Sequence, residues 1–505
     1  MIKNAINTVT RLFGRTKNTV TRRFSGARFA NSSALLSSIE AINRDLLNNL
    51  DALRSRSRNA RKNDPYATKY ALNSGINIIG PNGIRLQSQV VEFDAVANKY
   101  VPDTVARKAI EAAWADWCSR CDVTGRQDLR AMLTSTCESM TTDGEYLVRI
   151  VRGRGYGGQH RIALQRIDVD RLDTRYNVAL NNGNRVVMGV ELDAFGVPVA
   201  YHLFTAHPAD YGAPRVRTRV PANEIIHGFL VWEADQVRGI PWLHSALIGL
   251  YHLNEYAISA LLNARHGADH YGFFTTKDGQ NPLSAELGDD GEPLVINQPG
   301  TYDALPHGTE FVQNNSRYPE VAFGAFVKTT LQRIATGLGT QYHSISGDLE
   351  GVNFSSIRAG LIEERDMWDT RRAWLCSSLL ERVFSDWLES SLLSGAITLP
   401  NGNALPPYKL DRFTAHSWSG RGWAWVNPLQ DVQANIEAVR AGFTSPQTIA
   451  AQNGGDYADN IADIADAAAI AAAAGVNLAA YDSHPGATSQ IQPSTPPDEG
   501  DTPVP

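Results

Sequence analysis

Residues 224–246, EIIHGFLVWEADQVRGIPWLHSA, and residues 353–366, NFSSIRAGLIEERD, decide the fold class of this chain. The first stretch predicts a strand, a turn and then a helix, because Pro241 just after Gly239 suits the first helical turn. The second stretch predicts a helix that starts at polar residues. Neither stretch contains a group of side chains that could catalyse a reaction.

The sequence on either side of these stretches predicts an α+β chain. Over residues 145–231, short runs of alternating apolar and polar side chains end at Gly and Asn-Gly turns, which is typical of an antiparallel or mixed sheet. Helical spacing returns over 241–266, about 321–339 and about 355–393. A small insertion with strand-like pieces and an acidic centre separates the first two of these helices. Residues 428–478 are alanine-rich and predict further helices.

The composition indicates a globular chain of about two to four structural regions, with 505 residues of which 43% are hydrophobic. There is no apolar run of about 18 residues that would predict a membrane span, and the N-terminus lacks the apolar core of a signal peptide. Four cysteines do not make a disulfide framework at this length, which suits a reducing cytosol.

Charge is unevenly distributed along the chain. Residues 1–62 carry thirteen basic and three acidic side chains, so the rest of the chain holds a net charge of −16 within the total of −6. We expect this basic arm either to bind a polyanion or an acidic partner, or to be a solvated leader. The last residues, 482–505, contain six prolines and little apolar bulk, which predicts a disordered tail.

Short motifs that could carry chemistry have structural explanations. The glycines of GRGYGG at 153–158 follow a strand but precede another strand, so they predict a hairpin turn and not a dinucleotide site. Cys118 and Cys121 form a lone CxxC without two further zinc ligands at suitable spacing, which favours buried thiols. His227 lies between apolar strand residues and is expected to be a core or inter-subunit group. The chain contains no Walker A loop.

The order of the helical elements points to an assembly. A helix, an acidic insertion, a return helix, a glycine-bounded polar loop and a long helix follow one another. These helices are apolar over more than one narrow stripe, which favours packing against neighbouring subunits in a ring. A helical hairpin within a monomer is the alternative.

Seven motifs, in this order, are similar to those of one protein family. They are NDPYA (63–67), INIIGPNGI (76–84), TTDGEYLVRIV (141–151), IIHGF (225–229), DQVRGIPWL (235–243), IATGLGTQYHSISGD (334–348) and NFSSIRAG (353–360). Together they resemble the lambda-type portal proteins of tailed bacteriophages, over roughly residues 60–455.

The resemblance implies an α+β portal fold and a ring oligomer in which each chain has a wing, a stem, a clip and a crown. With the two ends of this chain, which the resemblance does not cover, nine segments follow one another. These are a basic, partly disordered N-terminal arm (1–62), a wing with a mixed or antiparallel sheet (63–240), a stem helix (241–270), a small α/β clip (271–320), a stem return helix (321–342), a tunnel loop (343–354), a long channel helix with more of the wing (355–427), an α-helical crown (428–481) and a disordered tail (482–505).

The resemblance also implies which residues meet DNA and partners. The tunnel loop would line the channel through His343, Ser344, Ser346, Asp348, Glu350 and Asn353, the stem would contribute Lys328 and Arg333, and the clip would bind partners through Asp289, Asp290 and Glu292. Each phosphate that a protein neutralises adds affinity, which would slow a sliding duplex. We therefore expect Asp348 and Glu350 to keep the constriction weakly repulsive, with limited backbone contact from Lys328 or Arg333.

The function implied is that of a dodecameric ring at one capsid vertex, through which double-stranded DNA is packaged and ejected. Such a ring docks the terminase large subunit and head-completion or adaptor proteins, and it contacts major capsid and scaffolding proteins. It would be assembled in the host cytoplasm and reside in the virion, with no catalytic residue, cofactor, metal or membrane. The alternatives are another head–tail connector or minor capsid ring protein, or a DNA-processing enzyme, whose catalytic residues we do not find.

Overall fold

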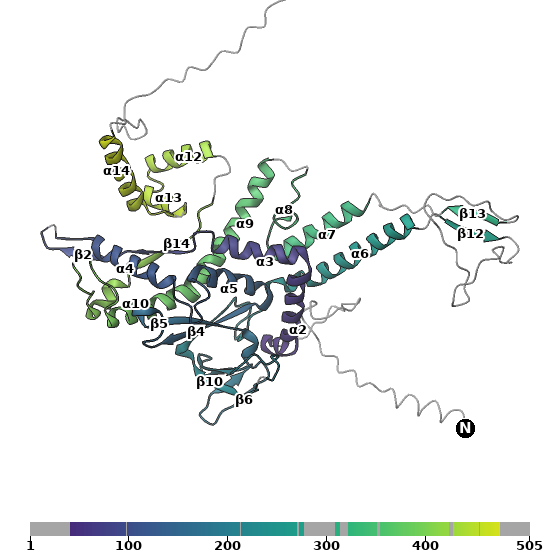
Figure 1. The fold of residues 1–505 in the computed structure, drawn as a ribbon, viewed down its shortest axis with the longest axis horizontal. Coiled ribbons are helices and arrows are strands. Elements are labelled where there is room, and N and C mark those ends of the chain that lie inside the picture. Colours follow the sequence, from purple (N-terminus) through teal and green to yellow (C-terminus); the bar gives the residue numbers. More distant parts are fainter. Residues whose placement is uncertain are drawn as a thin grey trace, which may run out of the picture. The chain divides into compact units, whose positions relative to one another are not determined.

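The structure is a computed structural model that describes residues 41–96, 98–212, 214–269, 272–276, 309–313, 322–350, 354–423, 428–453 and 455–474. The chain divides into two units, Met1–Arg421 and Gly422–Pro505 (Figure 1). The first unit combines sheets with helices, whereas the described part of the second contains only helices. None of the described helices is long and apolar enough to cross a membrane.

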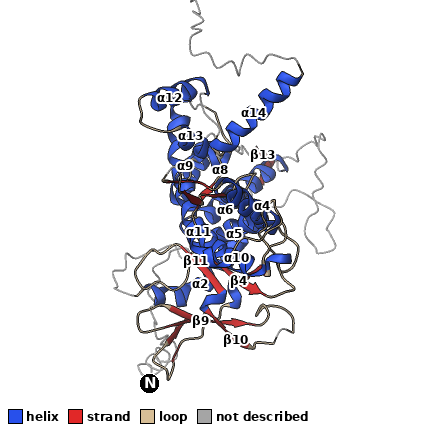
Figure 2. Cartoon of the chain, turned by 90° about the vertical axis from the view of Figure 1, so that its left-hand side faces the viewer, coloured by secondary structure: helices blue, strands red, loops and turns tan. Residues whose placement is uncertain are grey.

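Two antiparallel sheets lie in the first unit. One has the strand order β11 (Ile225–Phe229), β4 (Glu145–Arg152), β5 (Ile162–Ile167). The other has the order β10 (Arg217–Pro221), β9 (Pro198–Phe204), β8 (Val190–Leu192), β7 (Arg185–Val187), β6 (Val178–Ala179). Figure 2 shows strands of both sheets at the lower end of this unit. The predicted antiparallel sheet is thus confirmed.

The glycine-rich segment 153–158 connects β4 to β5, as predicted. A short 3₁₀ turn, η2 (Gly158–His160), ends the connection, and the two strands pair antiparallel. Gly157 has a φ of 60°, and a Cβ there would lie 1.8 Å from the carbonyl oxygen of Ile162. Glycine is therefore required by the turn and not by a bound phosphate.

Helix α2 (Ile42–Asn63) corrects the expected boundary of the N-terminal arm. We expected a partly disordered arm over 1–62, but α2 is a 22-residue helix within that range. Its buried Ile42, Leu46 and Leu50 belong to the same core cluster as residues of β4, β8 and β9. The spacing of these apolar residues buries one face of α2, although its other faces are polar and basic.

Three further helices and two small sheets belong to the first unit, and α5 (Leu129–Asp143) packs against β4. The helices are α3 (Pro65–Ile78), α4 (Thr104–Cys118) and α5 (Leu129–Asp143), and each begins at an Asp N-cap that accepts backbone N–H groups. The small sheets pair β1 (Arg85–Ser88) with β14 (His416–Ser419) and β2 (Val91–Asp94) with β3 (Lys99–Pro102). Cys118 and Cys121 at the end of α4 are free thiols, and burial raises the pKa of Cys121 to about 12.

A pair of helices projects from the first unit. A 3₁₀ turn, η5 (Trp242–Ser245), precedes α6 (Leu247–Asp269), and α7 (Ala322–Leu338) returns beside it (Figure 1). Tyr256 of α6 stacks on Phe323 of α7, with ring centroids 5.5 Å apart. Strands β12 (Gly272–Thr276) and β13 (Thr309–Gln313) pair beyond the ends of these helices.

The long helix expected from about 355 to 393 is continuous but not uniform. It consists of α9 (Phe354–Leu375), a π-helical turn η6 (Cys376–Leu380) and α10 (Glu381–Ser394). Phe384 and Trp387 of α10 contact Trp114 of α4, with ring centroids 5.7 and 4.9 Å from it. The second unit contains α12 (Pro428–Arg440), α13 (Pro446–Gln452) and α14 (Tyr457–Ala473).

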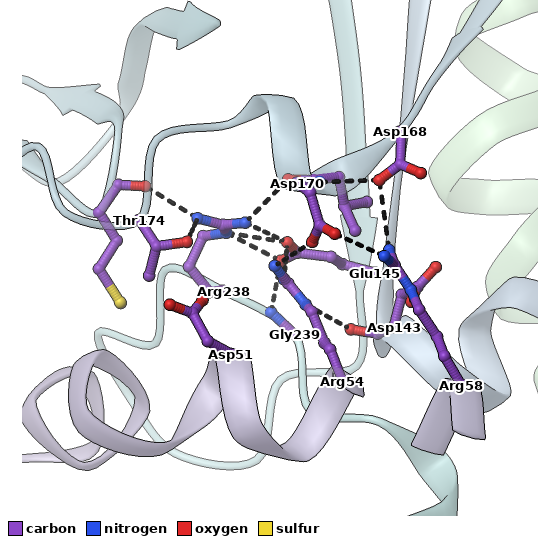
Figure 3. A network of polar contacts seen from close by, with 12 residues as sticks. Asp51, Arg54, Arg58, Asp143, Glu145, Asp168, Asp170, Thr174, Arg238 and Gly239 are labelled. Atoms are coloured by element: carbon purple, nitrogen blue, oxygen red, sulfur yellow. Dashed lines mark hydrogen bonds and ion pairs between the residues drawn. The ribbon is translucent and has the colours of Figure 1, made fainter. Parts of the chain in front are cut away.

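A fully buried carboxylate connects the sheets, α2 and the start of the projecting helices (Figure 3). Glu145 of β4 accepts hydrogen bonds from Arg238 Nε and Nη2 at 2.9 and 2.6 Å and from the Gly239 N–H at 2.7 Å. Arg54 of α2 also pairs with Glu145. His227 Nε2 lies 3.1 Å from the same carboxylate, so the expectation of a core role for His227 is confirmed.

The charges of this network compensate one another. Burial alone would raise the pKa of Glu145, but Arg238 and Arg54 hold it well below the usual range. Burial lowers the pKa of His227, which therefore stays neutral near pH 7. Arg238 reaches further, to the carbonyl of Met188 at 2.9 Å, and so also attaches the five-stranded sheet.

Two glycines allow the segments of this network to approach. A Cβ on Gly239 would lie 2.1 Å from the carbonyl oxygen of Gly144, and a Cβ on Gly144 would lie 2.1 Å from the carbonyl carbon of Ile240. Gly144 also has a φ of 77° and ends α5. Gly144 and Gly239 lack a side chain at the point where their two backbone segments touch, so a larger residue would not fit at either position.

Replacing Glu145 by Gln should lower the free energy of unfolding by about 3–5 kcal/mol, because Arg238 would remain buried without a counter-ion. Arg54 would keep only its longer pair with Asp170, at 3.7 Å. Urea unfolding followed by tryptophan fluorescence measures this change. The matched control is Glu437→Gln, which removes an exposed pair with Arg440 and should cost less than about 1 kcal/mol. Equal stability of the two variants would contradict the role assigned to Glu145.

Candidate functional site

The described residues predicted to line a channel lie on α7, on α8 and directly after α8. Lys328 and Arg333 lie on α7. His343, Ser344 and Ser346 do not lie in an irregular loop as expected, but on a short helix, α8 (Tyr342–Ser346). Gly347, with a φ of 75°, ends α8 and is followed by Asp348 and Glu350. Asn353, Asp289, Asp290 and Glu292 lie outside the described residues.

Asp348 is held in place and is not a free charge. Its carboxylate accepts hydrogen bonds from the Glu350 N–H and the Tyr342 hydroxyl, both at 2.9 Å, and Lys328 Nζ lies 4.0 Å away. The carbonyl of Asp348 accepts from His343 Nδ1 at 2.6 Å. These contacts, led by the Glu350 N–H, lower the pKa of Asp348. Asp348 is thus an ordered carboxylate close to Lys328, and its repulsive role stays a prediction.

Glu364 of α9 holds α8 against α9. It is 5% exposed and accepts the Gln341 N–H at 3.0 Å, the Ser344 hydroxyl at 2.6 Å and the Trp368 indole N–H at 3.1 Å. On the other side, Asn73 of α3 donates to the carbonyl of Ser344 at 3.1 Å. The short helix is thus attached to both α3 and α9 through polar contacts.

Two charged side chains at this site are exposed and have no ionic partner among the described residues. They are Arg333 of α7 and Glu350 after α8. The site therefore combines a rigid turn with one free carboxylate and one free guanidinium. An exposed guanidinium of this kind can contact an anionic ligand weakly.

The projecting helices expose more apolar surface than a solvated hairpin needs. On α6, Leu261 is 71% exposed, and Tyr251, Ile258 and Leu262 are also exposed. Phe326 of α7 is 51% exposed, although it contacts Tyr256. Contiguous exposed apolar patches of this kind mark protein interfaces.

One cluster among the described residues has the composition of a metal site, namely Asp168, Asp170 and His207. Arg58 already pairs with both carboxylates. His207 Nδ1 accepts the Ala209 N–H at 3.1 Å, so a neutral ring carries its hydrogen on Nε2, which faces the carboxylates. The cluster is therefore an ion-pair network that secures α2.

Comparison with known proteins identifies the family. The model of the lambda family of phage portal proteins matches residues 31–372. A probable portal protein of Halomonas phage phiHAP-1 is 36% identical over 419 residues, which cover 81% of this chain and 78% of the relative. Portal protein B of Escherichia phage lambda is 22% identical over 382 residues, which cover 69% of this chain and 71% of the relative.

Among solved structures, a chain of the native gene transfer agent virion aligns with this chain at 12% identity and a TM-score of 0.44. That match covers 79% of this chain and 92% of the other. An HK97-family phage portal protein from Corynebacterium diphtheriae matches with 10% identity and a TM-score of 0.27, covering 61% of this chain and 84% of the other. On the strength of the family model and the curated relatives, the chain belongs to the lambda family of phage portal proteins.

Replacing Asp348 by Ala should release the segment after α8. We expect backbone amide hydrogen exchange at residues 347–350 to accelerate roughly tenfold, because the carboxylate no longer accepts from Tyr342 and the Glu350 N–H. Mass spectrometry of exchanged peptides measures this rate. Glu350→Ala is the matched control, since that exposed side chain has no described partner, and it should leave the rate unchanged. Equal exchange in both variants would contradict the role of the Asp348 carboxylate in ordering this segment.

Proposed function

We propose that this portal protein assembles into a ring of about twelve copies at one vertex of the capsid, with a channel for packaging and ejecting double-stranded DNA. The family match carries the proposal, since it extends over the projecting helices, α8 and most of α9. The exposed apolar face of α6 supports it, because neighbouring copies would cover that face. The role is mechanical, without catalysis.

We infer that α8 and the residues after it form the narrowest part of the channel. The hydrogen bonds of α8 and its following residues with Glu364, Asn73 and Asp348 would keep this segment from moving into the channel. Glu350, repeated in every copy, would then supply a ring of negative charge that opposes tight DNA binding. Arg333 would supply limited attraction, so that the duplex is confined but can slide.

The proposed partners follow from this position. The ring would dock the terminase large subunit during packaging and head-completion proteins afterwards, and it would contact capsid and scaffolding proteins at the vertex. Asp289, Asp290 and Glu292 stay a prediction of the terminase-facing surface, because they lie outside the described residues. Assembly would take place in the host cytoplasm.

Native mass spectrometry and negative-stain electron microscopy of the purified protein test the proposal. The chain has a mass of 55.2 kDa. We expect a particle of about twelve copies, or roughly 660 kDa, with an axial hole. A monomer, or a closed particle without a hole, would contradict the proposal and favour a different head protein.

Replacing Glu350 by Lys should impair DNA packaging or the speed of DNA exit. Each subunit would gain a cation at the constriction, so DNA would be held more tightly and more so at low salt. Packaged DNA per particle measures the effect in vitro, and Glu350→Gln is a control that removes charge without reversing it. Packaging and retention equal to wild type in the Lys variant would count against a constriction at this turn.

A further inference from the structure

A second candidate site lies away from the α8 turn, in a polar cleft of about 440 Å³. The segment after α4, the last turns of α5 and strands β4 and β5 form its walls. Its lining includes the side chains of Arg126, Gln127, Ser139, Asp143, Arg166 and Asp168. Clefts of this size accommodate small ligands or short peptide segments.

One wall of the cleft is the outer edge of a sheet. Strand β5 is an edge strand, since the order is β11-β4-β5. Leu164 already pairs outward, because its N–H donates to the Cys121 carbonyl at 2.6 Å and its carbonyl accepts from Val123 at 3.0 Å. Two residues further on, the N–H and carbonyl of Arg166 point to the same side. Neither group has a hydrogen-bond partner among the described residues.

The carboxylates of the cleft are already engaged. Asp122 accepts backbone N–H groups from Arg126 and Gln127 at 3.0 and 3.3 Å. Arg58 pairs with Asp143 and Asp168. Glu145 at the inner end is neutralised by the buried arginines described above.

Unlike these carboxylates, two arginines of the cleft have no ionic partner among the described residues. Arg126 and Arg166 are exposed and form no ion pair among the described residues. Arg166 Nη1 donates only to the neutral Ser135 hydroxyl, at 2.8 Å. Asp143 and Asp168 act on the charge of Arg166 without pairing with it directly. The cleft therefore offers guanidinium donors that are not all used, together with an open main-chain donor and acceptor.

We propose that this cleft binds an extended acidic peptide segment of a partner protein. The segment would add as a short strand to the free edge of β5 at Arg166, which is how extended peptides join open sheet edges. Its acidic side chains would pair with Arg126 and Arg166, whose planar guanidinium groups match carboxylates.

Peptide carboxylates suit the cleft better than nucleic acid does. The wall already carries four carboxylates, so a run of closely spaced phosphates would be repelled once it passed the two arginines. A peptide can place one carboxylate at each arginine and keep neutral residues beside the acidic wall. The open main chain of Arg166 also favours a peptide, because a phosphate backbone cannot continue a β ladder.

Binding of the fluorescently labelled peptide TVEVDT to the full-length assembly tests this proposal by fluorescence anisotropy. Arg126→Gln and Arg166→Gln should each weaken binding about tenfold, and higher salt should weaken it further. Arg175→Gln is the matched control, because that arginine is exposed, lies outside the cleft and should leave the affinity unchanged. The neutral peptide TVQVNT should bind at least about tenfold more weakly than TVEVDT.

A second pair of measurements separates strand addition from simple anion binding. N-methylation of the central peptide bonds blocks main-chain pairing and should weaken binding, and inorganic phosphate should compete poorly. The proposal is overturned if both arginine variants bind TVEVDT like wild type, which would place binding elsewhere on the chain. It is also overturned if the methylated peptide binds as well as the parent and phosphate competes fully, since the cleft would then be an anion site only.

Discussion

The need to compensate one buried carboxylate governs the architecture of the first unit. Glu145 is fully buried, and burying a charge is costly unless partners surround it. Those partners come from α2, from strand β11 and from the segment before η5, so all three are held against β4. Because Arg238 and Gly239 directly precede η5 and α6 in the chain, this network also fixes the point from which the projecting helices start.

Periodicity in the sequence predicted the sheets and the major helices because these elements bury one regular face. It did not predict α2 as part of the core, since Arg54 and Arg58 look the same in a sequence whether they face water or a buried acid. The sequence likewise placed Lys328, Asp348 and Glu350 near one another through family resemblance, but not their contacts. Glu364 accepts the Gln341 N–H and the Ser344 hydroxyl, and no sequence pattern distinguishes such a buried acceptor from an exposed carboxylate on a helix.

Helix α8 and the residues after it have one side bonded to the protein and one side exposed to solvent. Toward the protein, Glu364 and Asn73 restrict the short helix, so its position is set by packing and hydrogen bonds. Toward solvent, Glu350 and Arg333 are exposed without partners in the described part of the chain. A rigid support with sparse, balanced charge is what confinement of a moving polyelectrolyte requires, since strong contacts would trap it.

The π-helical turn η6 helps to keep the buried side of one continuous helix, α9 to α10, facing its neighbours. Buried residues recur every four positions at Leu375, Leu379, Val383 and Trp387. In a regular α-helix that spacing would rotate the buried side by about 40° per turn and carry it away from its neighbours. The wider turn at Cys376–Leu380 takes up part of that rotation. A single continuous helix therefore carries both Trp368, which lies beside Tyr70 of α3, and Trp387, which lies beside Trp114 of α4.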